Sequence, residues 1–271
     1  MNSLFFYRST EKELPLPEEE IVQFNPEEEP WRLEESIKRN GNLYPDHPMM
    51  SMMPYLDINY GDRFDYLVSM SSSAVMLKNY AELNYGKNSS VANAVQNVAL
   101  GDSNATLIRT VNGKMMTLHH DTSTPHPREY TRLQGTKGIF LADNDYNDAP
   151  DSRTIYLEGI SPKEDQWEPA EKYLKEYTPS IITNYNPPPR KSGGEILGHG
   201  DGGTQTPMNW HRLIVALREN KLPDWDVYDS VTSSAISALT EKSVSNKCKP
   251  IDFPDFTKGK WKTRQRRITL S

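Results

Sequence analysis

Apolar and polar residues alternate along several stretches in the middle of the chain. Strand patterns of this kind cover residues 64–73, 104–122, 128–143 and 152–159. In the first, the alternation places Tyr66, Val68 and Met70 on one face of a strand. The second predicts a hairpin, because two apolar-rich runs flank the turn sequence Val-Asn-Gly-Lys.

Helical spacing of apolar residues appears before and after these strands. The predicted helices cover Trp31–Lys38, residues 48–58, Trp167–Tyr177, Pro207–Asn220 and a segment that follows Asp226. The second of them is a short buried helix, kinked at Pro54, whose methionines are more typical of core packing than of a metal site. The last begins at an aspartate that suits a helix N-cap and has apolar residues at helical spacing from Val227 to Leu239.

The order of these elements predicts an α+β fold. Loop and helix come first, strands that pair antiparallel follow, and helices return after them. This order is typical of an open, mostly antiparallel sheet with helices covering one face. We expect one domain over residues 31–271, whereas the acidic, proline-containing lead segment 1–30 is not assigned to it.

Composition excludes several classes of protein. The 271 residues carry a formal charge of −6 at pH 7, so we expect no nucleic-acid partner, and the basic run 258–267 is interpreted as a solvated tail or a subunit-contact strand. A single cysteine, Cys248, excludes an internal disulfide and a cysteine-based zinc site. No apolar run approaches the roughly 20 residues of a membrane span, and the first residues lack the basic region of a signal peptide. The composition is that of a soluble globular protein, and it leaves the compartment open.

Residues 198–203 (GHGDGG) formally match the dinucleotide fingerprint GxGxxG. That fingerprint needs a hydrophobic strand directly before it, whereas the preceding stretch is broken by the prolines 187–189. We therefore reject a dinucleotide site here. A glycine loop that enters a helix still exposes backbone N–H groups, so a contact with substrate or an anion stays open, with His199 lining the pocket.

Histidines also gather in the stretch 119–126. Neighbouring residues of a strand point to opposite faces, so His119 and His120 cannot easily bind one metal ion together. We expect polar strand-end residues beside a site, with Tyr130 facing it, and no metal. No carboxylate pair stands out from the surface charge, so a two-carboxylate glycosidase has no visible support.

Residues 39–48 (RNGNLYPDHP) concentrate polar and aromatic groups in a short stretch. One interpretation is a turn in which asparagine and aspartate side chains satisfy backbone donors. The other is a site in which His47 carries a proton and Tyr44 hydrogen-bonds a sugar hydroxyl, since histidine titrates near neutral pH. The stretch by itself does not decide between the two.

Ordered motifs run from about residue 30 to the end of the chain. WRLEESIKRNGNLYPDHP is followed by LDINYGDRFDYLVSMSS, GDSNATLIRTVNGKMM, HHDTSTPHPREYTRLQGTKG, GHGDGG and VYDSVTSSAISALTEKSVSNKCKPIDFPDFTKGKW. Together these motifs resemble glycoside hydrolase family 109, the NAD-dependent α-N-acetylgalactosaminidases of the Gfo/Idh/MocA superfamily. The resemblance corresponds to the family's C-terminal, MocA-like half.

The resemblance implies a glycosidase that uses NAD without net redox. NAD⁺ takes a hydride from C3 of the sugar, and the resulting ketone acidifies the C2 proton. The leaving group is eliminated, water adds and the hydride returns. Because the cofactor supplies the hard chemistry, such a site needs no carboxylate pair.

The resemblance also implies which residues form the site. The substrate-binding candidates are Arg32, Tyr44, Pro45, Asp46, His47 and Tyr130, to which we add His199 from the glycine loop. Tyr44 matches a nicotinamide contact and His47 an acid/base, so these two are the catalytic candidates. At position 46 the family usually has Thr, whereas this chain has Asp.

Family members open with a Rossmann domain, which is not recognisable in these 271 residues. The resemblance therefore implies that this chain alone binds NAD poorly or not at all, and is inactive unless a separate polypeptide supplies the Rossmann half. Two alternatives stay open: a sugar dehydrogenase of the same superfamily, and a non-enzymatic oligomeric fragment. The exposed face of an open sheet needs covering, so we expect a homo-oligomer that forms through the sheet.

Overall fold

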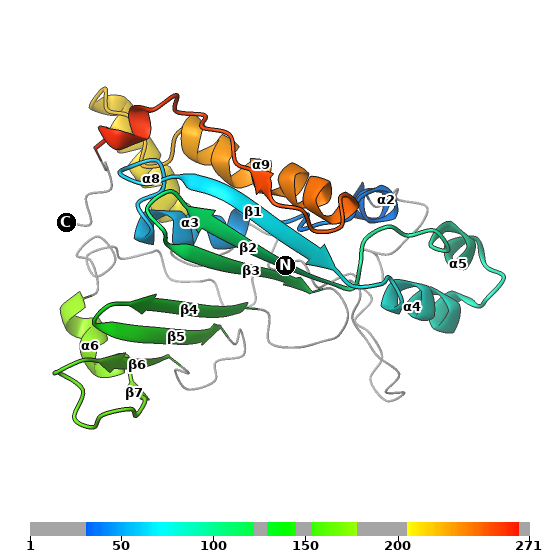
Figure 1. Ribbon diagram of the computed structural model, residues 1–271, viewed down its shortest axis with the longest axis horizontal. Helices are drawn as coiled ribbons and strands as arrows, with labels where there is room; N and C mark the ends of the chain where they lie inside the picture. The colour runs from blue at the N-terminus through cyan, green and yellow to red at the C-terminus, as the bar shows by residue number, and fades with distance from the viewer. Residues whose placement is uncertain (1–30, 122–128, 145–152, 178–204, 266–271) are drawn as a thin grey trace. The chain divides into compact units, whose positions relative to one another are not determined.

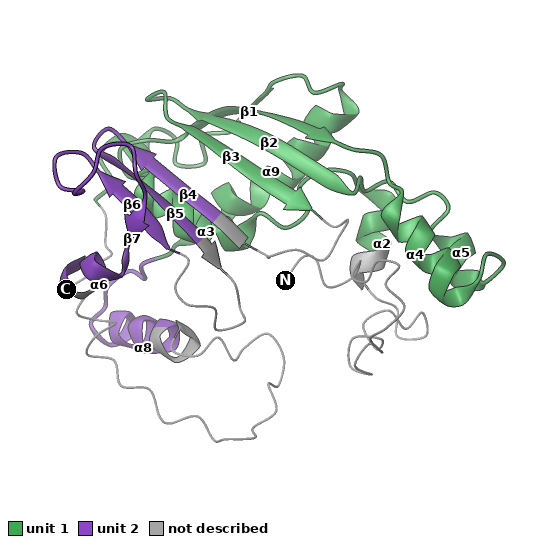
Figure 2. Ribbon diagram, turned by 90° about the horizontal axis from the view of Figure 1, so that it is seen from below, with its two compact units in different colours: residues 1–126, 225–265 green, residues 127–224, 266–271 purple. Residues whose placement is uncertain are grey.

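The chain folds into two compact units, which Figure 2 colours separately. Unit 1 combines residues 1–126 and 225–265, and unit 2 combines residues 127–224 and 266–271. The computed structural model describes residues 31–121, 129–144, 153–177 and 205–265 (Figure 1). Unit 1 is thus built from two stretches of chain that are separated in sequence by almost all of unit 2.

Unit 1 contains a four-stranded antiparallel sheet in the order β3-β2-β1-β8. Its strands are β1 (Phe64–Ser71), β2 (Ser103–Thr110), β3 (Met115–Asp121) and β8 (Ile251–Asp252). The predicted hairpin is confirmed as β2–β3, and Gly113 in its turn has a φ of +87°, a conformation that favours glycine. Asn112 and Gly113 therefore set the register of the two strands.

Five α-helices belong to the described part of unit 1. They are α2 (Trp31–Lys38), α3 (Asp46–Tyr55), α4 (Met76–Tyr85), α5 (Ser90–Ala94) and α9 (Val227–Ser245). The predictions of α2 and α3 are confirmed, and Pro54 lies inside α3. The apolar pattern did not predict α4 and α5, which bury residues such as Leu77 and Val91 in a small cluster of their own.

Helix α9 confirms the prediction of Asp226 as its N-cap. The Asp226 carboxylate accepts a hydrogen bond from the backbone N–H of Tyr228 at 2.9 Å, and Asp229 accepts one in return from the Asp226 N–H at 3.2 Å. This reciprocal pair is a capping box. Of the apolar residues whose spacing predicted the helix, Val227 is 71% exposed, whereas Ala235 and Leu239 pack against the core.

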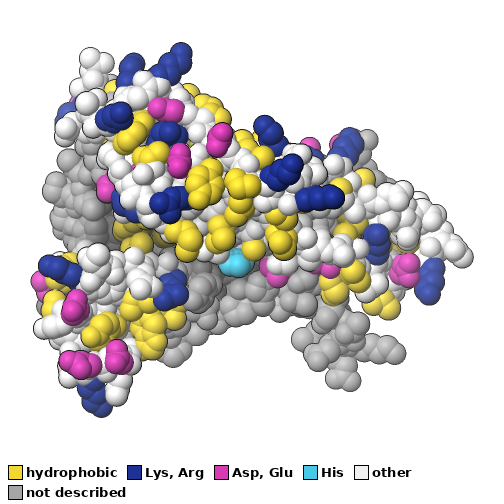
Figure 3. All heavy atoms as spheres, viewed as in Figure 1, with side chains coloured by type: hydrophobic (Ala, Val, Ile, Leu, Met, Phe, Trp, Pro, Cys, Tyr) yellow, Lys and Arg dark blue, Asp and Glu magenta, His cyan; other side chains and the backbone are white. Residues whose placement is uncertain are grey.

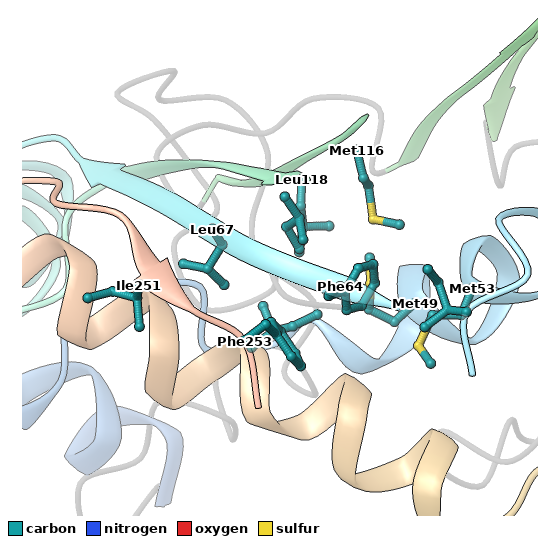
Figure 4. Close-up of a cluster of buried hydrophobic side chains, with 11 residues drawn as sticks. Met49, Met53, Phe64, Leu67, Met116, Leu118, Ile251 and Phe253 are labelled. Atoms are coloured by element: carbon teal, nitrogen blue, oxygen red, sulfur yellow. The ribbon is translucent and has the colours of Figure 1, made fainter. Parts of the chain in front are cut away.

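The main core of unit 1 lies between one face of the sheet and the helices α3 and α9 (Figure 4). Its buried side chains come from the strands, from both helices and from the loops beside them: Met49, Met53, Ile58, Phe64, Leu67, Ile108, Met116, Leu118, Ile236, Ile251 and Phe253. Met49 and Met53 confirm that the methionine run fills the core, whereas Met50 is half exposed. Each such side chain stabilises the fold by about 1.5–3 kcal/mol through its removal from water.

The opposite face of this sheet is exposed and carries large apolar side chains, together with Arg109, Thr117 and His119. Tyr66, Val68 and Met70 share that face, as predicted, and Leu107 pairs directly with Val68. Met70 is 62% exposed and Met115 is 68% exposed. Figure 3 shows hydrophobic side chains gathered over these strands. A β-bulge between Phe64 and Tyr66 shifts the register, so that Phe64 at the start of β1 is buried.

The end of unit 1 is fixed by Arg264. Its guanidinium lies between the rings of Tyr60 and Tyr228, at 4.6 and 4.8 Å from their centroids, and donates a hydrogen bond to Asp226 at 2.6 Å. Arg264 is therefore packed, whereas Lys258, Lys260 and Lys262 of the same basic run are exposed, as a solvated stretch would be. Burial, together with the nearby charge of Asp229, raises the pKa of Tyr60 to about 12.

Unit 2 contains a second antiparallel sheet, in the order β4-β5-β6-β7. Its elements are β4 (Glu129–Gly135), β5 (Gly138–Asn144), β6 (Thr154–Leu157), β7 (Glu168–Pro169), α6 (Glu171–Tyr177) and α8 (Gln205–Arg218). The β4–β5 hairpin turns between Gly135 and Gly138, as the sequence predicted. The prediction of a helix from Trp167 was wrong at its start, because Glu168 pairs with Ile155 of β6 and delays the helix to Glu171.

The α+β fold class is confirmed. Every pair of named strands is antiparallel, and helices cover one face of the sheet of unit 1. Of the helices in the described ranges, none combines the length and apolar character of a transmembrane segment. The assignment of residues 31–271 to one domain, with 1–30 outside it, stays a prediction.

Candidate functional site

Residues 39–45 connect α2 to α3, and together with the first turn of α3 they contain most of the candidate site residues. Pro45 is buried and takes the N-cap position of α3, and Asp46 and His47 form the first turn of that helix. A proline and an acidic residue both suit the start of a helix, because the first backbone N–H groups there have no partner within it. The stretch is therefore a turn that ends in a helix N-terminus.

The first half of this stretch is fixed to helix α9. Arg39 forms ion pairs with Glu35 of α2 and with Glu241 of α9. At Gly41 a Cβ atom would lie 2.7 Å from the Thr240 Oγ1 and 2.9 Å from the Glu241 nitrogen, so only glycine permits this approach. The backbone N–H of the next residue donates to the Thr240 Oγ1 at 3.0 Å.

The side chain of Asn42 shapes the turn that follows. Asn42 is buried, and its Oδ1 accepts a hydrogen bond from the backbone N–H of Tyr44 at 3.3 Å. This contact, two residues along the chain, is the interaction expected of asparagine in a turn. The Nδ2 atom of Asn42 has no hydrogen-bond partner among the described residues.

The two catalytic candidates lie against each other. The rings of Tyr44 and His47 are stacked, with centroids 4.7 Å apart and planes inclined by 27°. Tyr44 is half-buried and His47 is exposed. The structure thus presents an imidazole to solvent on an aromatic surface, an arrangement that can hold a flat ligand group beside a proton carrier.

The carboxylate of Asp46 is directed to α9. Its Oδ1 accepts hydrogen bonds from the hydroxyl of Ser233 at 3.0 Å and from that of Ser234 at 3.3 Å. Neither serine was predicted, because both are more than 185 residues away along the chain and no local pattern links them to Asp46. The hydroxyl-rich run TSSAIS in α9 was the one signal that pointed to polar contacts on this helix.

The other candidate residues are distributed over the chain. Arg32 lies in α2 of unit 1, and Tyr130 lies in β4 of unit 2. His199 and the loop GHGDGG lie outside the described residues. Within unit 1 the structure brings Tyr44, Pro45, Asp46 and His47 together, and the roles assigned to all seven residues stay predictions.

The histidines of β3 point to opposite faces, as predicted. His119 is exposed, whereas His120 is 6% exposed and its Nδ1 has no hydrogen-bond partner in the described part of the chain. Burial lowers the pKa of His120 to about 4, because the charged form loses its hydration. Among the described residues no group of three or more His, Cys, Asp or Glu side chains has metal-binding geometry.

Comparison with known sequences identifies close relatives of the chain. The family model described as "Glycosyl hydrolase 109, C-terminal domain" matches residues 17–263, and so begins within the lead segment 1–30. A glycosyl hydrolase family 109 protein of Solibacter usitatus is 39% identical over 239 residues, which cover 87% of this chain and 50% of that protein. A protein of Shewanella oneidensis named alpha-N-acetylgalactosaminidase is 34% identical over 85% of this chain and 48% of its own length. The chain spans about half the length of the curated relatives it matches.

Solved structures share the fold at low sequence identity. An oxidoreductase domain protein from Kribbella flavida has a TM-score of 0.54 at 16% identity and covers 83% of this chain and 54% of its own. A levoglucosan dehydrogenase in complex with NADH and levoglucosan has a TM-score of 0.51 at 18% identity, over 83% of this chain and 53% of its own. These similarities show that the chain shares its α+β fold with both proteins. With the family model matched over residues 17–263, the chain belongs to glycosyl hydrolase family 109, of which it carries the C-terminal domain.

Proposed function

We propose that this chain forms the substrate side of an NAD-dependent glycosidase that acts on α-N-acetylgalactosaminides or related glycosides. The proposal is supported by the family and by the relative named alpha-N-acetylgalactosaminidase. The observation that carries it is the stack of Tyr44 and His47 at the start of α3. An exposed imidazole held on an aromatic ring can move a proton at a sugar that binds over both groups.

The described residues fit one end of NAD. The half-buried ring of Tyr44 offers a flat surface for a nicotinamide, as the resemblance to the family implies. Dinucleotide folds are built on parallel strands, whereas all named strand pairs in the described part of the chain are antiparallel. The remainder of NAD would therefore be held by a nucleotide-binding half, supplied by other residues of the same protein or by a separate chain.

The residues of this chain then have limited, specific roles. When bound, NAD⁺ supplies a transient oxidation at C3 of the sugar that is reversed before product leaves, so cleavage proceeds without net redox. His47 exchanges a proton between its imidazole and the sugar while the leaving group departs and water adds. Arg32 and Pro45 are the further proposed sugar contacts in unit 1, and the resemblance to the family adds Tyr130, while His199 is our own addition.

Calorimetry tests whether NAD⁺ is bound by this chain or by another half of the enzyme. We expect the 271-residue chain alone to show no micromolar affinity for NAD⁺, and a micromolar dissociation constant would overturn the proposal that another half binds the cofactor. A chimaera with the half of the Solibacter usitatus relative that this chain does not cover should bind NAD⁺ and release nitrophenol from nitrophenyl α-N-acetylgalactosaminide. His47→Ala in the chimaera should reduce the rate by about 10²–10⁴-fold.

A sugar dehydrogenase is the second candidate function. The fold shared with levoglucosan dehydrogenase favours it, although a similarity at 18% identity speaks for the fold alone. The chimaera distinguishes the two directly. Accumulation of NADH with a free sugar and no release of nitrophenol identifies a dehydrogenase, whereas glycoside cleavage without net NADH identifies a glycosidase.

We also propose that a second copy of the chain covers the exposed face of the sheet of unit 1. That face carries a contiguous apolar surface of Tyr66, Val68, Met70 and Leu107 on β1 and β2, and Met115 lies beyond Arg109 on β3. Contiguous apolar surface on a monomer marks an interaction site. Sedimentation velocity should give the mass of a dimer or a larger assembly, and a monomer at micromolar concentration would contradict this.

A further inference from the structure

Helix α9 turns hydroxyl groups toward its buried side. Thr232, Ser233, Thr240 and Ser243 are buried on the same side of the helix as Ile236, which is fully buried. Positions 233, 236, 240 and 243 follow the three- and four-residue spacing of one helical face. Small hydroxyl side chains let backbone approach the helix closely, and each buried hydroxyl needs a hydrogen-bond partner.

Those hydroxyls are bonded to two different parts of unit 1. Ser243 accepts a hydrogen bond from the backbone N–H of Ser69 in β1 at 2.9 Å. Thr240 accepts one from the Asn42 N–H, and Ser233 donates one to the Asp46 carboxylate. One face of α9 therefore joins the sheet to both ends of the stretch that carries Tyr44. Seven residues separate Ser233 from Thr240, which is about 10 Å along the helix axis.

Asp46 is the contact closest to the proposed chemistry. It precedes His47 directly and lies in the same first turn of α3. Its Oδ1 receives two hydroxyl groups, although Ser233 can also reach the carbonyl oxygen of Ser230 at 3.2 Å. The Asp46–Ser233 distance of 3.0 Å is the shorter of the two contacts that Ser233 makes. The position of the Asp46 carboxylate affects the direction of the first turn of α3. It therefore also affects where the His47 imidazole lies on the Tyr44 ring.

We propose that Asp46 is a positioning residue, with Ser233 and Ser234 as its partners on α9, and that this contact holds His47 in its stack on Tyr44. The proposal deepens the proposed function by giving Asp46 a role other than direct sugar contact. Its structural part does not depend on that function, since the ring stack is a contact between two residues of this chain. Thr240 supports the other end of the same stretch in the same way.

An NMR measurement on the full 271-residue chain tests the structural part. The stacked tyrosine ring shields the His47 ring protons, and this upfield shift should be lost in Asp46→Ala and in the double variant Ser233→Ala/Ser234→Ala. Asp46→Asn keeps an acceptor oxygen for the two hydroxyls, so it should retain the shift. The matched control Ser230→Ala/Ser245→Ala removes two exposed hydroxyls from the same helix and should also leave the shift unchanged.

The outcomes separate a positioning role from a ligand role. An unchanged His47 shift in the Ser233→Ala/Ser234→Ala variant, with the fold intact by circular dichroism, would overturn the proposal. Loss of the shift in the control variant as well would do the same, because the effect would then belong to the helix as a whole. Rescue by Asp46→Asn supports the proposal, since a neutral amide keeps the geometry of the carboxylate and removes its charge.

Kinetics in the NAD-binding chimaera test the functional part. We expect Ser233→Ala/Ser234→Ala to lower kcat by about 10- to 100-fold with KM nearly unchanged, the effect of a misplaced catalytic group. A rise in KM with kcat unchanged would instead identify Asp46 as a sugar ligand and overturn the positioning role. A wild-type chimaera that binds NAD⁺ and cleaves no glycoside refutes the proposed function, and the NMR result then still decides the positioning role.

Discussion

Both faces of the sheet in unit 1 carry apolar side chains, but only one face is buried in the core. The covered face buries Leu67 and Ile108, but also the polar side chains of Ser69, Asn104 and Thr106. The outer face carries large apolar side chains such as Met70 and Met115 in water. Alternation along a strand separates two sets of residues, and only the contacts of each set show which one is the core.

The polar residues of the covered face form a connected network. The Asn104 Nδ2 donates to the hydroxyls of Ser69 and Ser71, each at 2.9 Å, and the hydroxyls of Ser69 and Thr106 are 2.9 Å apart. A buried polar group is tolerated when it is hydrogen-bonded. The covered face thus combines apolar packing with fixed hydrogen bonds, whereas the outer face combines exposed apolar side chains with the polar side chains of Arg109, Thr117 and His119.

The largest expected difference in the free energy of unfolding is between substitutions at two neighbouring residues of β2. Ile108→Ala opens a cavity in the core and should lower the free energy of unfolding by about 2–5 kcal/mol. Leu107→Ala, on the outer face, should change it by no more than about 0.5 kcal/mol in the monomer. Urea unfolding at low protein concentration measures both. Equal losses in the two variants would mean that both faces are buried.

The neighbouring residues His119 and His120 of β3 allow the exposed and the covered face to be compared through the pH dependence of stability. The pKa of His120 is lowered in the folded state to about 4, so the unfolded chain binds the extra proton between about pH 6.5 and pH 4. Burial of His120 therefore does not lower the free energy of unfolding above about pH 6.5. Below that pH the free energy of unfolding falls by about 1.4 kcal/mol per pH unit, so that about 2 kcal/mol is lost at pH 5.

Two variants isolate the contribution of His120. His120→Gln should remove most of the stability difference between pH 7 and pH 5, whereas His119→Gln should leave it in place because His119 is exposed. Chemical unfolding at the two pH values gives the comparison. The attribution to burial fails if His119→Gln has the larger effect.

The polar network should contribute less to the free energy of unfolding than the apolar core does. Asn104→Ala removes the amide that is hydrogen-bonded to the hydroxyls of Ser69, Ser71 and Thr106, and should cost about 1–3 kcal/mol because the buried network loses these hydrogen bonds. Thr117→Val, at an exposed position of the adjacent strand, is the matched control and should stay within about 0.5 kcal/mol. Thermal unfolding of both variants measures the difference.

The smallest effect on the monomer is expected on the outer face, together with the largest effect on assembly. Met115→Glu places a charge on the exposed apolar surface and should change monomer stability by less than about 0.5 kcal/mol. It should shift the sedimentation profile toward the monomer, because burying an unpaired charge in an interface is costly. An assembly that survives Met70→Glu/Met115→Glu would exclude this face as the interface.

Local sequence signals predicted much of the fold. The Val-Asn-Gly-Lys turn located the β2–β3 hairpin, and Asp226 located the start of α9, because turn chemistry and helix capping act within a few residues. The helices α4 and α5 were missed, and α6 was started too early at Trp167. In that last case strand pairing with β6, a contact outside the local window, determined the structure.

The candidate site was predictable only in part. Tyr44 and His47 are three residues apart, and the start of a helix brings their rings together. The partners that hold the stretch, Ser233 and Thr240, come from a helix almost two hundred residues later. Their role depends on how α9 packs against the rest of unit 1. No pattern within a single sequence predicts that packing. The apolar residues of α9 indicated a helix, but its hydroxyl groups determine what it holds.

The split construction of unit 1 has a consequence for synthesis. Residues 225–265, which include α9 and β8, leave the ribosome roughly 5–20 s after residue 126 at ordinary rates of translation. During that interval β1 lacks its neighbour β8, and Leu67 and Ile108 lack the cover of α9. Both faces of the nascent sheet are then in contact with water, so the chain is most prone to aggregate, and most dependent on chaperones, while unit 2 is being made.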